Sequence, residues 1–354
     1  MTRTLAATLA LALFASTAPA REASDLGRTL DVYLSRLARL GFTGTVLVAR
    51  DGKIVLERGY GFADRARKVP MAADSVVNLG SITKQFTAAA ILKLEMSGKL
   101  RVEDTIAKFW PGAPADKAGI TLHQLLTHTG GLRSDYGPTD YEVVPRDEYV
   151  RRVLAAPLDM PPGREYQYSN AGYSLLAAIV EIVSGQPYER FLREQLFEPA
   201  GMRQTGYRVA SWREGQVARG YVDERDWGTI VEKLADPALP YWNLVGNGGI
   251  HSTAGDMYRW HLALEGDAVL SKAARAKLFT AHVPEDPEGR SHYSYGWAIF
   301  TTPRQTRLIA HNGGNGVYAA DFRRYVDEGV VIFAASTAEP TAIALTEVLP
   351  AIVF

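Results

Sequence analysis

The sequence predicts a mixed fold of helices and strands (α+β or α/β), built on one antiparallel sheet flanked by helices, with a large, mainly helical inserted region. Strand-like runs lie near both ends of the chain, in "TGTVLVARDGKIVLERGYGFAD" and in "RLIAHNGGNGVYAADFRRY" followed by "EGVVIFAAS". Helical and loop patterns dominate between them. One sheet that joins the two ends explains this order. We therefore predict a sheet part at about 21–75 and 286–354 and a helical part at about 76–285.

The elements near the N-terminus follow from local patterns. Helical spacing of leucines predicts an amphipathic helix that ends at Gly41, with an apolar face of Leu26, Leu30, Leu34 and Leu37. Asp51-Gly52 between two β-rich runs predicts a tight hairpin. The stretch "ITKQFTAAAILKLEMSGKL" predicts a closely packed helix that is capped by Gly98.

The first twenty residues, "MTRTLAATLALALFASTAPA", resemble a secretory signal peptide. They combine one early cation, Arg3, with an apolar run and small residues that end at Ala20. We expect a signal peptide at 1–20, a mature domain at 21–354, and a periplasmic or secreted protein. The apolar run is short for a membrane span, and the chain has no cysteine for lipid attachment, so we expect no stable membrane anchor.

Composition excludes several functional classes. The absence of cysteine excludes thiol catalysis and thiolate metal sites. Lys plus Arg and Asp plus Glu balance at 39 each, which argues against nucleic acid as a partner. The histidines are scattered, and His123 and His128 are five residues apart, not the four that place two ligands on one helix face. We expect no metal and no cofactor, and the sequence does not indicate an oligomeric state.

The stretch "NLGSITKQFT" contains Ser81 followed three positions later by Lys84. If Ser81 opens a helix, Lys84 lies one turn further on the same face and can help to remove the serine proton. The alternative is that Ser81 only caps the helix, because serine is a favoured N-cap residue.

A second motif is Tyr168-Ser169-Asn170 in "REYQYSNAGYSLL". In an extended loop, residues two apart point the same way, so Tyr168 and Asn170 can face one cleft. A neighbouring lysine cation is expected to lower the pKa of Tyr168 and to make the phenol a base for Ser81. Tyr241-Trp242-Asn243 repeats the pattern, and we keep Tyr241 as a candidate substrate-binding residue.

A third motif is His311-Asn312-Gly313-Gly314, which follows a predicted strand. Glycines there would allow backbone N–H groups to approach a bound carbonyl group. A similar sequence, "LLTHTGGL", contains His128. It predicts a helix that ends in a glycine cap, with the histidine bonded to nearby backbone.

Together, Ser81-x-x-Lys84, Tyr168-x-Asn170 and His311-x-Gly313 resemble the active-site motifs of the serine β-lactamase superfamily. The resemblance is to the branch with class C β-lactamases, D-Ala-D-Ala peptidases, D-aminopeptidases and carboxylesterases. It covers essentially residues 25–354, including "PGREYQYSNAGYSLL", "GNGGIHSTAGDM" and "YGWAIF".

The resemblance implies a serine hydrolase that forms an acyl-enzyme on Ser81, and the predicted signal peptide implies that it is secreted. Lys84 and Tyr168 would move the proton, and either could be the acylation base. Asn170 would hydrogen-bond Lys84 and the substrate. The N–H groups of Ser81 and Gly314 would form the oxyanion hole, beside His311 and Gly313.

The chain departs from many β-lactamases at the third motif, where it lacks Lys-Thr-Gly. A histidine with an ordinary pKa of about 6.5 is largely neutral at pH 7 and offers a hydrogen bond instead of a cation. We therefore expect a small ester or a D-amino-acid peptide as substrate, and poor β-lactam turnover. A true β-lactamase, or a penicillin-binding or cell-wall-peptide sensor with little turnover, remains an alternative. Loops near 133–150 and 210–245 are expected to set specificity.

Overall fold

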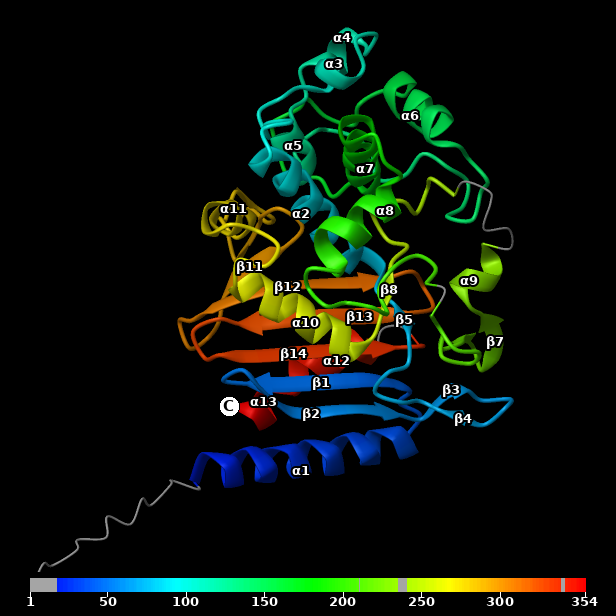
Figure 1. The fold of residues 1–354 in the computed structure, drawn as a ribbon, viewed down its shortest axis with the longest axis vertical. Helices are drawn as coiled ribbons and strands as arrows, with labels where there is room; N and C mark the ends of the chain where they lie inside the picture. The colour runs from blue at the N-terminus through cyan, green and yellow to red at the C-terminus, as the bar shows by residue number, and fades with distance from the viewer. Residues whose placement is uncertain (1–17, 210, 235–240, 339–340) are drawn as a thin grey trace, which may run out of the picture.

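One eight-stranded antiparallel sheet organises the structure (Figure 1). The computed structural model describes residues 18–209, 211–234, 241–338 and 341–354. The strand order β2-β1-β14-β13-β12-β11-β10-β9 places the N-terminal hairpin beside the C-terminal strands. The predicted fold class is therefore confirmed. The strands of this sheet are β1 (Gly44–Arg50), β2 (Lys53–Tyr60), β9 (Val283–Pro284), β10 (Ser291–Tyr293), β11 (Ala298–Thr301), β12 (Arg307–Gly314), β13 (Ala319–Tyr325) and β14 (Val330–Ser336).

The hairpin between β1 and β2 forms where the sequence predicts it. Asp51 and Gly52 connect the strands, and both have positive φ, at 50° and 72°. Two consecutive left-handed residues make the tight turn whose twist matches that of the flanking strands. The predicted hairpin is confirmed.

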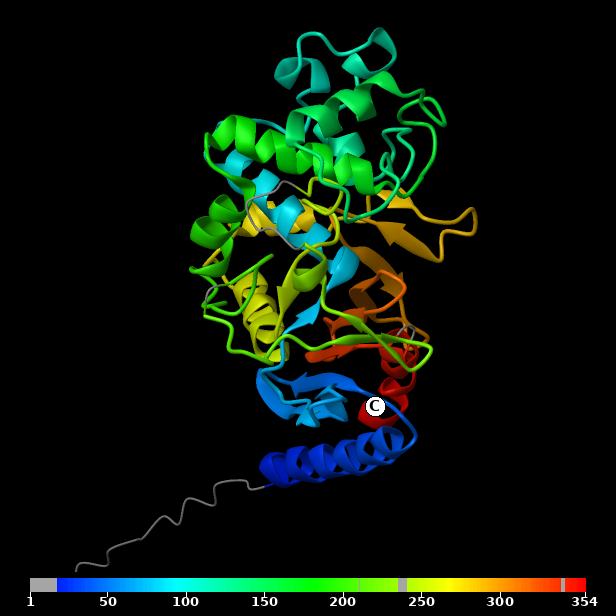
Figure 2. The same ribbon diagram turned by 90° about the vertical axis from the view of Figure 1, so that its right-hand side faces the viewer.

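Both faces of the sheet are buried, so the fold has three layers. Along β1, Val46 and Val48 pack into a cluster with Leu30 and Leu34 of helix α1 (Ala18–Arg39). The alternate residues of β1 pack on the opposite face in the larger core. Figure 2 shows the C-terminal helices on one side of the sheet and α10 on the other. Burial on both faces explains why β14 reads as the continuous apolar run "VVIFAAS".

The large core surrounds helix α2 (Thr83–Met96), which is apolar on nearly all sides and buried through most of its length. Gly98 follows it with a φ of 70°, as the predicted cap requires. The other helices are α3 (Ile106–Phe109), α4 (Ala115–Ala118), α5 (Leu122–Leu126), α6 (Arg146–Ala155), α7 (Asn170–Ser184), α8 (Tyr188–Leu192), α9 (Ile230–Lys233), α10 (Ala254–Glu265), α11 (Lys272–Leu278), α12 (Thr341–Val348) and α13 (Pro350–Val353), with a 3-10 turn η1 (Gly80–Ile82) and a π turn η2 (Arg193–Phe197).

The predicted helical part also contains short strands that the sequence pattern does not reveal. β5 (Val77–Asn78) pairs with β8 (His251–Ser252), and β6 (Gly220–Val222) pairs with β7 (Arg225–Gly228). β3 (Phe62–Asp64) and β4 (Val69–Pro70) form a further pair just before this part. Strands of two to four residues are too short to show an alternating pattern, and their pairing is decided by tertiary contacts.

Residues 1–17 lie outside the described residues, and with them most of the predicted signal peptide. Helix α1 begins at Ala18. Within the described part of the chain, no helix combines the length and the apolar character needed to cross a membrane.

Candidate active site

The chain brings Ser81 and Lys84 together as the spacing predicts. Ser81 lies in η1, directly before α2, and Lys84 occupies the first turn of α2. The Nζ atom of Lys84 donates a hydrogen bond to Ser81 Oγ at 3.1 Å. The N-cap residues of η1 and α2 are Leu79 and Ile82, and neither turn has a side-chain capping bond. Ser81 therefore faces the lysine instead of capping the helix.

Lys84 is fully buried, and its amine is held at three points. Besides Ser81, Nζ donates to Asn170 Oδ1 at 2.8 Å and to the carbonyl oxygen of Asn247 at 2.9 Å. Burial lowers the pKa of Lys84 to about 7, although the carboxylates of Asp135 and Asp140 act in the opposite direction. A substantial fraction of the amine is therefore neutral near pH 7 and can accept a proton.

Tyr168 lies in the loop before α7, with its ring centroid 4.7 Å from Lys84 Nζ. Its pKa is raised, first because burial disfavours the phenolate, while hydrogen bonding to Ser81 acts in the opposite direction. The prediction that the lysine lowers the pKa of Tyr168 is therefore wrong. Desolvation outweighs the other contributions, and it also reduces the charge of Lys84 itself.

Asn170 is the first residue of α7, and the N-cap is Ser169, whose Oγ accepts from Gly172 N. The Asn170 side chain links Lys84 to Asp135. Its Oδ1 accepts from Lys84 Nζ, and its Nδ2 donates to Asp135 Oδ1 at 2.9 Å. Sequence reasoning missed Asp135 and the Asn247 carbonyl. Asp135 lies in the loop predicted to set specificity, and Asn247 lies in the quoted stretch "GNGGIHSTAGDM".

His311 is neutral because its pKa lies well below the ordinary value. Burial, and then the nearby Lys84, lower its pKa to about 3. Its Nδ1 lies 2.5 Å from the Asn312 carbonyl oxygen, and its Nε2 lies 2.9 Å from Tyr293 Oη. The carbonyl can only accept, so Nδ1 donates and Nε2 accepts from the phenol. Both nitrogens thus have partners within the protein, whereas we expected the histidine to offer a hydrogen bond to the substrate.

The end of β12 packs backbone to backbone against Ser81. A Cβ atom on Gly313 would lie 2.5 Å from Ser81 N and 2.1 Å from Leu79 O. One on Gly80 would lie 2.6 Å from Gly314 N, and Gly80 also has a φ of 51°. Only glycine fits at these two contacts. They bring the backbone amides of Ser81 and Gly314 close to each other.

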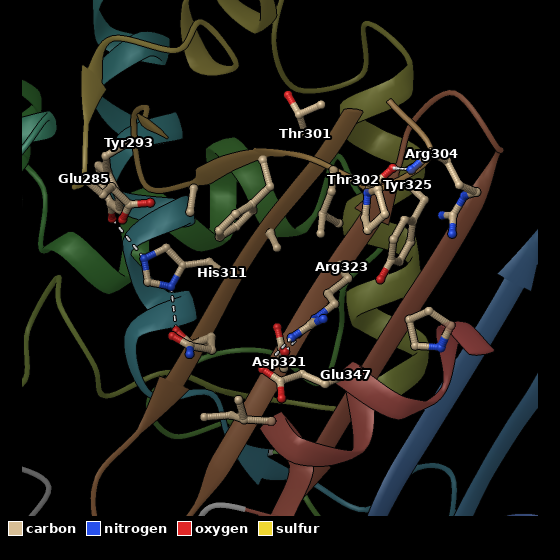
Figure 3. A pocket seen from close by; sticks show the side chains of 18 of the residues that line it. Glu285, Tyr293, Thr301, Thr302, Arg304, His311, Asp321, Arg323, Tyr325 and Glu347 are labelled. Atoms are coloured by element: carbon tan, nitrogen blue, oxygen red, sulfur yellow. Dashed lines mark hydrogen bonds and ion pairs between the residues drawn. The ribbon is translucent and has the colours of Figure 1, made fainter. Parts of the chain in front are cut away.

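A cavity of about 710 Å³ lies next to the site (Figure 3), although neither Ser81 nor Lys84 lines it. Tyr168, His311, Tyr293 and Glu285 line one end, and the cavity continues over β12 and β13 towards Arg323. Its size suits a small-molecule or short peptide ligand.

Tyr241 lies elsewhere. It lines a separate cavity of about 270 Å³ with Trp242 and Tyr207. The amide of Asn243 in the same repeat donates to the Thr139 carbonyl at 2.7 Å. Of the two Tyr-x-Asn motifs, Tyr168-x-Asn170 is thus the one that contacts Lys84.

His128 agrees with the sequence prediction only in part. It takes the left-handed position after α5 itself, with a φ of 57°, whereas a glycine cap was expected. The expected bond to nearby backbone is present, because Ser169 N donates to His128 Nδ1 at 3.0 Å. The imidazole also packs against Tyr168, with ring centroids 4.3 Å apart.

The arrangement combines a serine hydroxyl, a buried amine of lowered pKa, a phenol and two backbone amides that lie close together. These are the groups that acyl transfer through serine requires. Among the described residues, no group of three or more acidic or histidine side chains could hold a metal ion.

Comparison with known proteins agrees with this chemistry. The model of the family described as Beta-lactamase matches residues 34–348. Penicillin-binding protein 4* of Bacillus subtilis (strain 168) is 32% identical over 300 residues, which cover 81% of this chain and 66% of that protein. This chain therefore spans just under two thirds of that relative's length.

Two further proteins match over most of their lengths. D-alanyl-D-alanine-carboxypeptidase/endopeptidase AmpH of Escherichia coli (strain K12) is 29% identical over 322 residues, covering 85% of this chain and 80% of AmpH. The crystal structure of a penicillin binding protein from Bacillus halodurans superposes with a TM-score of 0.77 at 26% identity, covering 92% of this chain and 99% of that chain.

Proposed function

We propose that this chain, which belongs to the Beta-lactamase family, is a serine hydrolase that cleaves a small ester or a D-amino-acid peptide through an acyl-enzyme on Ser81. One observation carries the proposal. The amine of Lys84, buried and with its pKa lowered to about 7, lies 3.1 Å from Ser81 Oγ.

Acylation begins with Lys84 as the base. The neutral amine accepts the proton of Ser81 while Oγ attacks the substrate carbonyl carbon. The backbone N–H groups of Ser81 and Gly314 donate to the oxygen that becomes negative. Asn170 and the Asn247 carbonyl hold the amine in place throughout.

Tyr168 acts mainly as an acid. Its raised pKa makes the phenol a poor base at rest but keeps its proton available for the leaving group. Loss of the leaving group leaves an ester on Ser81. Water then attacks this ester, and its proton passes to the same pair of groups, so that the free serine is restored.

Two observations support an ester or peptide over a β-lactam as the preferred substrate. His311 is neutral and bonded to Tyr293, so this motif supplies no cation for a substrate carboxylate, which favours an uncharged ester over a β-lactam. AmpH, which is similar over most of its length, is named as a D-Ala-D-Ala carboxypeptidase and endopeptidase. The likeness to penicillin-binding protein 4* favours a second candidate function, a penicillin-binding module that acylates and releases slowly.

The test compares wild type with Ser81→Ala and with Ser97→Ala, a control serine just beyond the other end of α2 whose hydroxyl bonds the Leu94 carbonyl. Each protein is mixed with p-nitrophenyl acetate, a peptide ending in D-Ala-D-Ala, or nitrocefin. Product release and intact protein mass are then measured.

We expect turnover of the ester or the peptide by wild type and the Ser97 variant, and loss of both turnover and adduct in Ser81→Ala. A stable penicillin adduct without turnover of any substrate would favour the binding module. Nitrocefin turnover well above ester and peptide turnover would identify a β-lactamase. Equal behaviour of wild type and Ser81→Ala would reject the proposal.

A further inference from the structure

His128 has a backbone conformation that requires an explanation. Its φ of 57° is in the left-handed region, at the position after a helix that glycine normally occupies. A side chain there costs roughly 1 kcal/mol. Its Nε2 is also buried and has no hydrogen-bond partner among the described residues. Neither feature by itself stabilises the fold, so other contacts of the side chain must offset their cost.

The two residues that flank Tyr168 are both bonded to His128. Gln167 N donates to the backbone carbonyl of His128 at 2.8 Å, and Ser169 N donates to its ring Nδ1 at 3.0 Å. In a pair of strands, a backbone carbonyl group of the partner strand would accept the second of these bonds. Here the imidazole nitrogen accepts it instead. The imidazole also packs on the Tyr168 ring at a centroid distance of 4.3 Å.

These contacts extend to Asn170 as well. Ser169 is the N-cap of α7, and Asn170 is the first residue of that helix. A bond that fixes Ser169 N therefore fixes the turn from which both the phenol and the amide project. Only a neutral imidazole can serve, because the imidazolium ion has two donors and no acceptor. The full burial of the ring, beside Lys84, favours the neutral form.

We infer that His128 is a positioning residue, which holds Tyr168 and Asn170 in register with Ser81 and Lys84 by accepting the Ser169 N–H bond at Nδ1. The effect on the rate of hydrolysis that this inference predicts rests on the proposed function. The contacts themselves do not depend on that function.

The test uses two variants that both tolerate a left-handed backbone. His128→Gly removes the ring and its acceptor. His128→Asn removes the ring as well, but its Oδ1 occupies nearly the position of Nδ1 and can accept from Ser169 N. The difference between the two isolates the hydrogen bond. The control is His261→Asn, at a partly buried histidine of α10 whose Nδ1 accepts from Arg324 Nε at 3.1 Å.

Hydrolysis of p-nitrophenyl acetate, the melting temperature and a crystal structure are measured for each variant. We expect kcat to fall about 30- to 100-fold in His128→Gly with KM changed less than about threefold, because displacement of a reacting group by about 1 Å costs about that factor. His128→Asn should recover at least about tenfold of this loss. His261→Asn should keep the wild-type kcat even if its melting temperature falls.

Equal losses in the two His128 variants, or a wild-type kcat in His128→Gly, would overturn the inference. So would a His128→Gly crystal structure in which residues 168–170 have not moved. Failure of the proposed function is distinguishable, because wild type and Ser81→Ala would then hydrolyse the ester equally. In that case the position of residues 168–170 in the variant crystal structures still decides the role of His128.

Discussion

Replacement of Asp135 by asparagine should move the pH dependence of acylation to lower pH. The Asp135 carboxylate stabilises the Lys84 ammonium and so raises the pKa of Lys84. Only the neutral amine can accept the serine proton, so activity should rise with pH through the pKa of Lys84, near pH 7. Removal of the carboxylate lowers this pKa. The neutral amine then forms at lower pH, so the rising limb of the pH profile, where activity increases with pH, shifts to lower pH.

The size of the shift follows from the contacts through Asn170. Its amide bonds Lys84 Nζ at 2.8 Å and Asp135 Oδ1 at 2.9 Å, on opposite sides. With about 2 Å between the amide oxygen and nitrogen, the two charges lie about 7 Å apart. At an effective dielectric constant of about 20 their attraction is about 2 kcal/mol, which we halve to about 1 kcal/mol because Asp135 is exposed to solvent. That corresponds to about 0.7 pH units.

The assay is kcat/KM for p-nitrophenyl acetate, a neutral substrate, between about pH 5 and pH 9. At pH 6 the neutral fraction of Lys84, and hence the rate, should rise about fourfold in Asp135→Asn. Asparagine can still accept from Asn170, so the geometry is kept. Asp267→Asn, at an exposed ion pair with Arg275, controls for the change in net charge. An unmoved limb, or one shifted to higher pH, would refute the assignment of Lys84 as the base.

Two further predictions concern the same site. Lys84→Arg keeps a cation but removes the neutral form that can accept a proton. We therefore expect kcat for the ester and formation of the Ser81 adduct to fall at least about 1,000-fold. Retention of more than about a tenth of the rate would contradict base catalysis by Lys84. Gly313→Ala places a Cβ atom 2.1 Å from Leu79 O, so the melting temperature should fall by several degrees, by an overpacking cost of about 1–3 kcal/mol, and turnover should be lost. Gly248→Ala, where the nearest atom is 3.8 Å away, is the matched control in thermal melts and assays, and equal effects of the two alanines would contradict the close-contact argument.

Several elements could be predicted because their causes are local. The left-handed turn at Asp51-Gly52 and the glycine that follows α2 depend on a few neighbouring residues. The spacing of Leu30 and Leu34 is similarly enough to identify the buried face of α1. Such patterns predict elements and their apolar faces, since they reflect backbone geometry and hydrophobic burial.

The site was predicted only in part. Ser81 and Lys84 share one helical turn, so their contact follows from spacing alone. The partnership of Lys84 with Asn170 came from the family resemblance, and its contact with the Asn247 carbonyl was not predicted. The glycine cap expected after α5 was wrong, because His128 occupies the left-handed position and bonds the segment that contains Tyr168.

The sequence by itself determined the arrangement of strands at both ends with helices between them, the serine–lysine pair and the family to which the motifs belong. The tertiary structure alone decided the protonation states and the supporting contacts. The lowered pKa of Lys84 and the raised pKa of Tyr168 both come from burial by segments that are distant in sequence. Desolvation depends on everything packed around a group, and no spacing of residues along the chain contains that information.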